Sequence, residues 1–423
     1  MTRLLEGIRV LDFTQVLSGP TLTRYLSELG AEIIKVEPPR GDTTRATATV
    51  KNGRSGFFVS VNRGKRSLGV DLKSPEGRDL VLSLVPKCDI VVENFSPGAI
   101  ERLGFGWDTL HALHPGLVMC SISGFGQRGP MARLPGYDGV AQAYTGITSL
   151  LGEKDGPPIV SGAAVGDVLT GVNGVAAVLG ALFFRERTGE GQRVEVSVLD
   201  AYMQAHDAAL QTYSLSGGES IQTRSGQFHP LACPYGVFKT VDGYVFIAAA
   251  ADRHWLDLCA AMDRDDLAEL GHRWADRPTR EADRDLVNQV VEDWLMSQPS
   301  RDEAVTVLQQ HRVPAGPVLA IDEVVHHGDM REMGAIVTAD DPVTGPIDVP
   351  GFPLQYSAVE VGSDSEAPFL GEHNHEILIE VLGLDEQRYQ ALTDSGVLRA
   401  EPVTTRPSRQ RPLIDDPPGS ERS

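Results

Sequence analysis

The chain has 423 residues, with 38 Lys and Arg against 58 Asp and Glu, which gives a formal net charge of −20. Apolar residues make up 41% and charged residues 23%, a mixture typical of globular chains rather than of disordered or fibrous ones. The excess of acid argues against a general nucleic-acid or anionic-membrane binder, because either needs a broad basic surface. We find no apolar run approaching the roughly 18 residues that span a bilayer, and no signal peptide. Four scattered cysteines without metal-ligand or disulfide spacing favour a cytoplasmic location.

Strand and helix patterns alternate through the first 130 residues. Helical spacing covers Thr21–Leu29, and a second helix is predicted after Ser74, an N-cap residue followed by Pro75. This order predicts an α/β fold with a parallel sheet covered by helices on both faces. The predicted strands are Ile8–Thr14, Ala31–Glu37, Ser67–Leu72, Asp89–Asn94 and Leu117–Ser123.

The second half of the chain predicts a smaller domain inserted into the first. A long helix is predicted from Asp167 to Arg185, followed by a strand over Gln192–Val198 and a helix from Leu199. A hairpin around Asp242-Gly243 and helices over 252–312 follow, and strands at 317–321, 335–339 and 347–356 return to the first domain. The predicted parts are a large domain over 1–212 and 330–395, a small α+β domain over 225–325, and a disordered tail over 400–423.

The span from Arg24 to Arg78 is basic within an acidic chain. It holds eleven Lys and Arg against six Asp and Glu, a local net charge of +5. One interpretation is a cationic field that holds a compact polyanion such as a nucleotide phosphate, and the other is a solvated face with scattered bases. Charge alone does not decide between them.

The segment DGPPIVSGAAVGD, which ends at Asp167, is the most suggestive stretch for chemistry. Asp167 lies where a helix begins, so its carboxylate could simply cap that helix. It could also act as a nucleophile, because the neighbouring glycines expose backbone N–H groups that would stabilise an oxyanion. The two roles are compatible, since a helix N-terminus stabilises a carboxylate.

Several common sites are absent from the sequence. The turn QVLSGPTLT after the first strand is neither G-x-G-x-x-G nor a Walker loop, so the strand–helix pattern does not imply NAD or ATP binding. The histidine pairs His326-His327 and His373/His375 lack further ligands at supporting spacing, and no metal site is predicted. Ser123 is not in a nucleophile elbow.

The motifs taken together resemble the class III coenzyme A transferases, a family that includes formyl-CoA:oxalate and carnitine CoA-transferases and α-methylacyl-CoA racemases. The matching stretches include LLEGIRVLDFTQVLSGP, LGAEIIKVEPPRGDTTR, DIVVENFSPGAIERLGFGWDTL, SISGFGQRGP, GYDGVAQAYTG, SGAAVGD and LGEHNHEIL. They cover about residues 5 to 390 in order. The resemblance implies a Rossmann-like large domain built from both chain ends, a smaller domain, and an interlocked homodimer.

The resemblance also implies a mechanism with Asp167 as nucleophile. Its carboxylate would attack a donor thioester such as succinyl-CoA or formyl-CoA, pass through a mixed anhydride and then an aspartyl-CoA thioester, and deliver CoA to a carboxylic acid. No cofactor beyond coenzyme A, and no metal, is implied. The family's CoA contacts correspond here to Val16, Leu17, Ser18, Arg40, Leu72, Lys73, Asn94, Phe95, Ser96, Arg102, Gly136, Tyr137 and Asp138.

Departures from the family pattern bear on the substrate. Racemases of the family carry a histidine where this chain has Tyr137, so an isomerase is the less favoured alternative. A catalytically silent CoA-binding protein is a second alternative. Leu17 replaces a polar acid-contacting residue of the oxalate enzymes, and only Gly217-Gly218 and Gly226 stand where those enzymes have a glycine-rich loop. A longer dicarboxylate such as succinate, malate, mesaconate, itaconate or glutarate is therefore at least as well supported as oxalate.

Overall fold

The computed structural model of the protein describes residues 3–362 and 365–401, so nearly all of the predicted tail at 400–423 lies outside the described residues. The described residues form two compact units. Unit 1 comprises those within 1–136, 166–201 and 329–423, and unit 2 those within 137–165 and 202–328.

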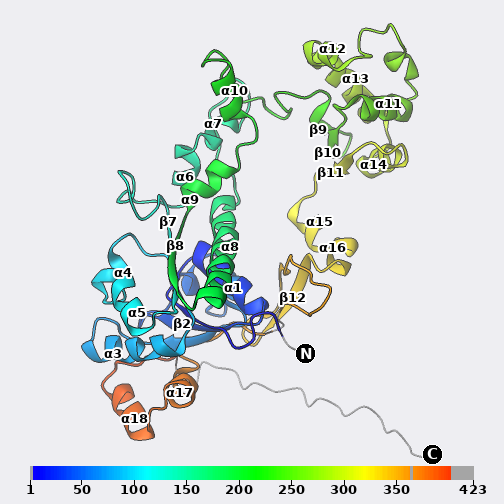
Figure 1. The fold of residues 1–423 in the computed structure, drawn as a ribbon. Coiled ribbons are helices and arrows are strands. Elements are labelled where there is room, and N and C mark those ends of the chain that lie inside the picture. The colour runs from blue at the N-terminus through cyan, green and yellow to red at the C-terminus, as the bar shows by residue number, and fades with distance from the viewer. Residues whose placement is uncertain (1–2, 363–364, 402–423) are drawn as a thin grey trace, which may run out of the picture. The chain divides into compact units, whose positions relative to one another are not determined.

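Unit 1 is built on a six-stranded sheet in which all neighbouring strands are parallel (Figure 1). The predicted mixed α/β fold with a large parallel sheet is therefore confirmed. The chain moves outward from β1 on one side, then returns to β1 and moves outward on the other. In sheet order the strands are β5 (Arg66–Gly69), β2 (Glu32–Glu37), β1 (Arg9–Asp12), β6 (Ile90–Glu93), β7 (Val118–Ser123) and β8 (Gln192–Ser197).

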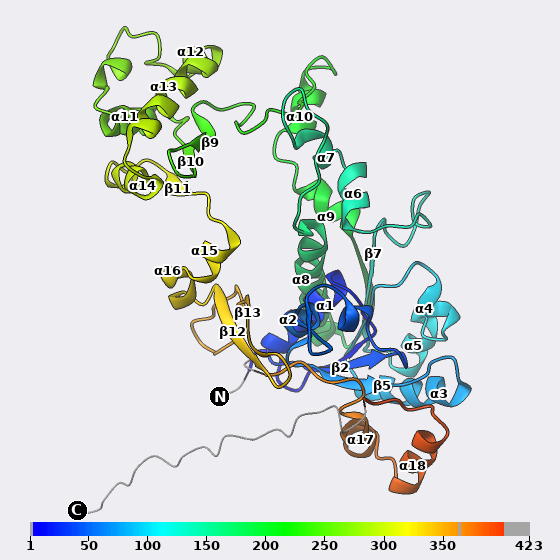
Figure 2. The same ribbon diagram turned by 180° about the vertical axis from the view of Figure 1, so that it is seen from behind.

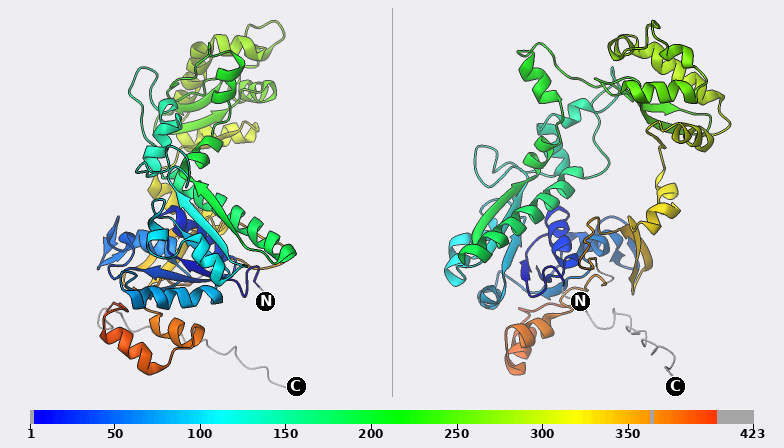
Figure 3. Two further views of the ribbon diagram at one scale, coloured as in Figure 1. Left: turned by 60° about the vertical axis from the view of Figure 1, so that its left-hand side comes forward. Right: turned by 45° about the vertical axis from the view of Figure 1, so that its right-hand side comes forward.

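Alternate residues of the strands point to opposite faces of the sheet and pack in two separate apolar cores, as expected for a sheet covered on both faces. Leu11 packs in one core with apolar residues of the helices that follow β5 and β6 and with the C-terminal helices. Val10 packs in the other core with Leu22 and Val178. In the left view of Figure 3 the C-terminal helices (orange and red) and the long green helix that carries Val178 accordingly lie on different sides of the blue sheet.

The helices of unit 1 begin close to their predicted positions. Ser74 accepts a hydrogen bond from the Gly77 N–H, so the predicted N-cap with Pro75 behind it is confirmed.

The antiparallel strands β12 (Ile336–Asp341) and β13 (Gly345–Pro350) lie beside α2 (Figure 2). The remaining elements are α1 (Ser18–Glu28), the 3-10 helix η1 (Thr43–Ala46), β3 (Val50–Lys51), β4 (Arg54–Ser55), α2 (Gly56–Asn62), α3 (Pro75–Leu84), η2 (Val85–Lys87), α4 (Ala99–Arg102), α5 (Trp107–Leu113), α8 (Val165–Thr188), α16 (Gly328–Glu332), α17 (Asn374–Glu376), the π-helical turn η4 (Ile377–Val381) and α18 (Glu386–Asp394).

Helix α8 differs from the sequence prediction in two ways. It begins at Val165, so Asp167 is its third residue and does not occupy the N-cap position. By length and composition it is also apolar enough to cross a membrane, although the sequence showed no uninterrupted apolar run of that length. Its buried residues recur every three or four positions, which is the pattern of a helix packed on a sheet.

Unit 2 contains the predicted hairpin. Strands β9 (Tyr235–Lys239) and β10 (Tyr244–Ala248) pair across Asp242-Gly243, and β11 (Ala315–Pro317) joins the other edge of β10. Apolar residues of α11 (Asp252–Ala261), η3 (Asp265–Ala268), α13 (Arg284–Ser297) and α14 (Arg301–Gln310) pack on one face of this small sheet. The other helices of unit 2 are α6 (Asp138–Tyr144), α7 (Ile147–Leu150), α10 (Ala209–Leu215), α12 (Arg277–Ala282) and α15 (Ile321–Val325), and the residues of α9 (Val198–Gln204) are divided between the two units.

Two segments depart from the sequence-based assignment. The strand predicted at 317–321 is wrong: β11 ends at Pro317 and helix α15 starts at Ile321, where the Glu323 side chain accepts a hydrogen bond from the Ala320 N–H. Residues 137–165, which the sequence placed with the large domain, group with unit 2 instead. A side-chain hydrogen bond joins this segment to the rest of unit 2, because the Tyr202 hydroxyl donates to Asp138 at 2.8 Å.

Candidate active site

The loops after β1 and β6 leave the sheet at the point where the strand order reverses. In open parallel sheets this switch point, at the carboxyl ends of the strands, is where ligands bind. The Asn94 side chain joins the two loops: its Oδ1 accepts from the Gln15 N–H at 2.8 Å and its Nδ2 donates to the Gln15 carbonyl at 2.7 Å. The structure thus brings the predicted residues Val16 to Ser18 next to Asn94.

A cavity of about 550 Å3 opens along the carboxyl ends of β1, β2, β5 and β6. Four of the predicted CoA-binding residues line it, namely Arg40, Leu72, Lys73 and Phe95. Phe13 and Leu103 add apolar surface to the same wall. A mixed wall of apolar side chains and two cations suits a ligand that combines a flat apolar ring with phosphate.

A second cavity of about 770 Å3 is lined by the next residues of the same β6 loop, from Ser96 to Gly98. Its lining includes the predicted residues Ser96 and Arg102, together with Gln127, Arg128 and Arg133, which the sequence reasoning missed. No carboxylate is among the described residues that line it. The sequence could have indicated these residues, because the loop GFGQRGPMARLPG follows a predicted strand, is rich in glycine and proline, and contains two arginines.

The basic span between Arg24 and Arg78 resolves into two groups of cations. Seven of its eleven bases form ion pairs inside unit 1, so neither of the two sequence interpretations describes them. Four bases, Arg40, Lys51, Lys73 and Arg78, form no ion pair with a described residue, and two of these line the 550 Å3 cavity. Cations without internal partners are the ones free to bind a ligand's phosphates.

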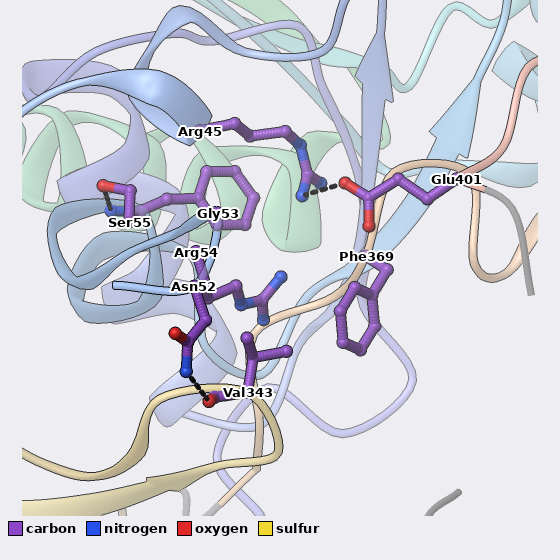
Figure 4. A pocket seen from close by; sticks show the side chains of 9 residues that line it. Arg45, Asn52, Gly53, Arg54, Ser55, Val343, Phe369 and Glu401 are labelled. Atoms are coloured by element: carbon purple, nitrogen blue, oxygen red, sulfur yellow. Dashed lines mark hydrogen bonds and ion pairs between the residues drawn. The ribbon is translucent and has the colours of Figure 1, made fainter. Parts of the chain in front are cut away.

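A smaller cavity of about 290 Å3 shows the opposite arrangement (Figure 4). Two of its lining residues are arginines of the basic span, and both are already paired. Arg45 binds Glu37 at 2.6 Å and also lies 3.9 Å from Glu401, and Arg54 binds Asp341 at 2.9 Å. This cavity therefore belongs to the internal framework of unit 1.

Asp167 is held close to the loop after β1 by a contact between two helices. A Cβ atom on Gly171 of α8 would lie 2.8 Å from the Ser18 carbonyl oxygen and 2.8 Å from Thr21 Cβ of α1, so the two helices touch backbone to backbone at this point. Asp167 precedes Gly171 by one helical turn, or roughly 6 Å along the axis. Its half-buried carboxylate therefore lies near the start of α1.

Helices α1 and α8 run in the same direction. Gly171 faces Ser18 and Thr21, and Gly174, further along α8, faces Leu22, further along α1. Their N-termini are therefore neighbours, and both present partial positive charge to one place. No side chain caps α1 at Leu17, so its first N–H groups remain available to an anion.

Glu93 is the last residue of β6 and precedes the loop whose residues line both larger cavities. Its carboxylate accepts a hydrogen bond from the Phe95 N–H at 2.9 Å. Burial raises the pKa of Glu93 to about 7, although the Ser121 hydroxyl and the Phe95 N–H oppose that shift. The Glu93 carboxyl group, which binds the backbone of the loop after β6, thus changes its charge near neutral pH.

Of the last three predicted CoA contacts, Gly136 belongs to unit 1, and Tyr137 and Asp138 belong to unit 2. Gly136 packs on Gly124, and Tyr137 precedes α6 with its side chain 74% exposed. Asp138, the first residue of α6, accepts the hydrogen bond from Tyr202.

Three of the four histidines that could have suggested a metal have other partners. His375 Nε2 lies 2.6 Å from Glu386, His373 Nδ1 accepts from the Ser67 N–H, and His326 Nδ1 bonds to the Asp322 carbonyl. Within residues 3–362 and 365–401, no group of three or more His, Cys, Asp or Glu side chains could hold a metal ion.

Comparison with known proteins gives a consistent family. Residues 5–374 match the model of CoA-transferase family III. The chain is 39% identical over 386 residues to the succinyl-CoA:mesaconate CoA-transferase of Haloarcula hispanica, covering 89% of this chain and 96% of that one. It is 35% identical over 415 residues to the formyl-CoA:oxalate CoA-transferase of Streptomyces avermitilis, covering 94% and 100%.

A solved structure agrees with this relationship. The crystal structure of a CaiB/BaiF family protein from Brucella suis superimposes with a TM-score of 0.79 at 33% identity, covering 90% of this chain and 100% of that one. Sequence and fold thus point to the same group of proteins over nearly the whole chain. The protein belongs to CoA-transferase family III.

Proposed function

We propose that this CoA-transferase moves CoA from an acyl-CoA donor to a carboxylic acid through a covalent intermediate on Asp167. The observation that carries the proposal is the contact of Gly171 with Ser18, which places Asp167 beside the β1–α1 loop and next to two helix N-termini. An ionised carboxylate in that field is stabilised, and so is the oxyanion that forms when it attacks a thioester.

The reaction follows from a nucleophilic carboxylate at this place. Asp167 attacks the thioester carbonyl, the C–S bond breaks, and a mixed anhydride and CoA thiolate result. The thiolate attacks the aspartyl carbonyl and releases the donor acid, which leaves an aspartyl-CoA thioester. An acceptor carboxylate then repeats both steps in reverse, so that Asp167 is regenerated and no proton or electron is gained or lost overall.

The two larger cavities, both lined by residues of the loop after β6, supply a binding site for coenzyme A. Arg40 and Lys73 offer unpaired cations beside apolar surface in the 550 Å3 cavity, as the adenosine phosphates require. Arg102 and Arg133 add cations without an ion pair to a described residue in the 770 Å3 cavity. We assign the CoA-binding role to both cavities.

A dicarboxylic acid is the proposed acceptor. Both relatives named above act on a dicarboxylic acid, mesaconate or oxalate, according to their names. Leu17, an apolar residue beside the start of α1, favours an acceptor longer than oxalate. Succinyl-CoA is the proposed donor.

We further propose that the protein acts in the cytoplasm as a homodimer. All four cysteines are buried and free, which suits a reducing compartment. The side of α8 that faces away from the sheet exposes large apolar residues, including Val168, Val172, Phe183 and Phe184. Soluble proteins usually cover such a face, and a second copy of the chain would do so.

The test of Asp167 uses a matched helical aspartate as control. Asp167→Ala should abolish CoA transfer from succinyl-CoA while calorimetric binding of CoA is retained. Asp200→Ala changes an acid in the first turn of α9, where Asp200 bonds to Ser197, and should leave transfer within a few-fold of the wild type. Transfer by the Asp167→Ala enzyme would disprove the mechanism. CoA binding without exchange in the wild type, across a panel of acids, would show a silent binding protein.

A further inference from the structure

The β1–α1 loop contains a strained residue. Val16 has a φ of +67°, in the left-handed region that β-branched residues avoid. A residue in such a conformation persists only where its surroundings hold it, and strain of this kind gathers at functional sites. Val16 is also partly exposed, so the strain does not serve to bury an apolar side chain.

Side chains from other elements hold the backbone of this loop. Lys35 of β2 donates from Nζ to the Thr14 carbonyl at 2.7 Å. Asp42 accepts from the Val16 N–H at 3.5 Å through Oδ1. With Asn94 on both polar groups of Gln15, three consecutive residues of the loop are bound by side chains that are remote in sequence.

Lys35 and Asp42 also bind each other. Their ion pair measures 2.9 Å, and both side chains are completely buried. Burial lowers the pKa of Lys35, but the Asp42, Asp12 and Glu37 carboxylates outweigh burial and raise it above its usual value. Lys65 is the other buried base that faces this cluster, and it pairs with Asp12.

A completely buried ion pair is an inefficient way to stabilise a fold. Removing two charges from water costs much of what their attraction returns, and a well-packed apolar pair of similar volume is often equally stabilising or better. Such pairs are best explained where they fix one arrangement among several. Here the arrangement that they fix is the left-handed turn at Val16.

We propose that Lys35 and Asp42 are positioning residues that hold Val16 in its left-handed conformation and thereby fix the loop from Val16 to Ser18 against the bound acyl-CoA. This inference rests on the proposed function. Lys35 and Asp42 are buried below the loop and do not need to touch the substrate. Their role is to keep the start of α1 and Asp167 in the spacing that the thioester requires.

The test replaces the ion pair with apolar residues. Lys35→Met/Asp42→Leu should keep the melting temperature within a few degrees of the wild type, while KM for succinyl-CoA rises about tenfold or more because the loop is released. The matched control is Arg54→Met/Asp341→Leu, which removes another buried ion pair of unit 1, whose other hydrogen bonds go to residues 343, 344, 367 and 368. The control should leave KM unchanged.

A rescue experiment separates positioning from general damage. Glycine adopts a positive φ without strain, so adding Val16→Gly to the double variant should return KM to within about threefold of the wild type. A folded double variant with unchanged KM would overturn the proposal, and so would a raised KM that glycine does not restore. If the double variant fails to fold, Lys35→Met/Asp42→Asn undergoes the same measurements, because it removes the Lys35 contact with the Thr14 carbonyl while Oδ1 of residue 42 still accepts from Thr44 and Val16.

Calorimetric binding of CoA to the wild type separates this inference from the proposed function. If the wild-type enzyme binds CoA and transfers it, but the variants do so equally well, the positioning role is wrong and the function stands. If the wild type neither binds nor transfers CoA, the proposed function itself is wrong.

Discussion

The Cα of Gly171 lies so close to the carbonyl oxygen of Ser18 that an added methyl group would stand 2.8 Å from that oxygen. The contact joins α8 to α1 one turn beyond the proposed nucleophile. It is the geometric reason why an acid at position 167 shares a site with the loop after β1.

A methyl group at position 171 should therefore separate the two helices. Gly171→Ala is expected to lower the free energy of unfolding by about 1 to 3 kcal/mol, because the clash is with backbone that cannot rotate away. It should also reduce kcat by displacing Asp167. Urea denaturation and initial rates measure the two effects.

Gly180 provides the control in the same helix. Nothing lies within 4 Å of a Cβ at this exposed position, so Gly180→Ala should raise the free energy of unfolding by about 1 kcal/mol through helix propensity. A similar gain from Gly171→Ala, with normal activity, would contradict the close contact.

The unpaired cations of the 550 Å3 cavity should determine CoA affinity. Arg40→Ala and Lys73→Ala are each expected to raise KM for acyl-CoA about tenfold, since a charge-assisted bond to phosphate contributes about 1.5 kcal/mol. Stopped or continuous assays at low and high salt should show that the effect shrinks as salt increases. Arg388→Ala, at an exposed position of α18, should leave KM unchanged, and an equal rise there would refute a specific role for the cavity.

Glu93 should make stability depend on pH. Its pKa of about 7 in the folded protein lies above the ordinary value of 4.5, so the folded state binds a proton that the unfolded state releases between those pH values. Stability contributed by Glu93 is therefore complete at low pH and is lost as the pH rises through 7. Glu93→Gln, which cannot ionise, should gain on the order of 3 kcal/mol over the wild type between pH 4.5 and 8. Denaturant titrations of both proteins across this range measure the difference, and a constant difference at all pH values would show that Glu93 is not the titrating group.

The apolar side of α8 should govern assembly. The wild type is expected to have a solution mass of twice 45.6 kDa by light scattering. Phe183→Glu should shift the equilibrium toward the single chain, because a carboxylate would be buried at the interface. Leu270→Glu, at a fully exposed apolar position in unit 2, is the control and should remain dimeric. A wild-type protein with the mass of a single chain would contradict the proposed homodimer.

Local patterns predicted the local structure well. Ser74 and Pro75 correctly predicted the start of α3, and Asp242-Gly243 correctly predicted the hairpin. The runs rich in β-branched residues predicted the parallel strands. These features depend on interactions within a few residues, so the chain order contains them. The strand predicted at 317–321 was wrong. A short apolar run is compatible with either a strand or a helix, and in this run only Pro317 pairs with β10, whereas helix α15 begins at Ile321.

The sequence by itself determined the alternation of strands and helices, the presence of an acid at the start of a long helix, and, through its motifs, the family. Tertiary structure alone decided which cations are paired internally, because Lys65 pairs with Asp12 of β1 and Arg54 with Asp341 of β12, which are remote from them along the chain. It also decided that Asp167 meets the β1–α1 loop, since Gly171 and Ser18 are remote along the chain and are brought together by packing of two helices on one sheet. Contacts of that range depend on how whole elements pack, and no local pattern encodes them.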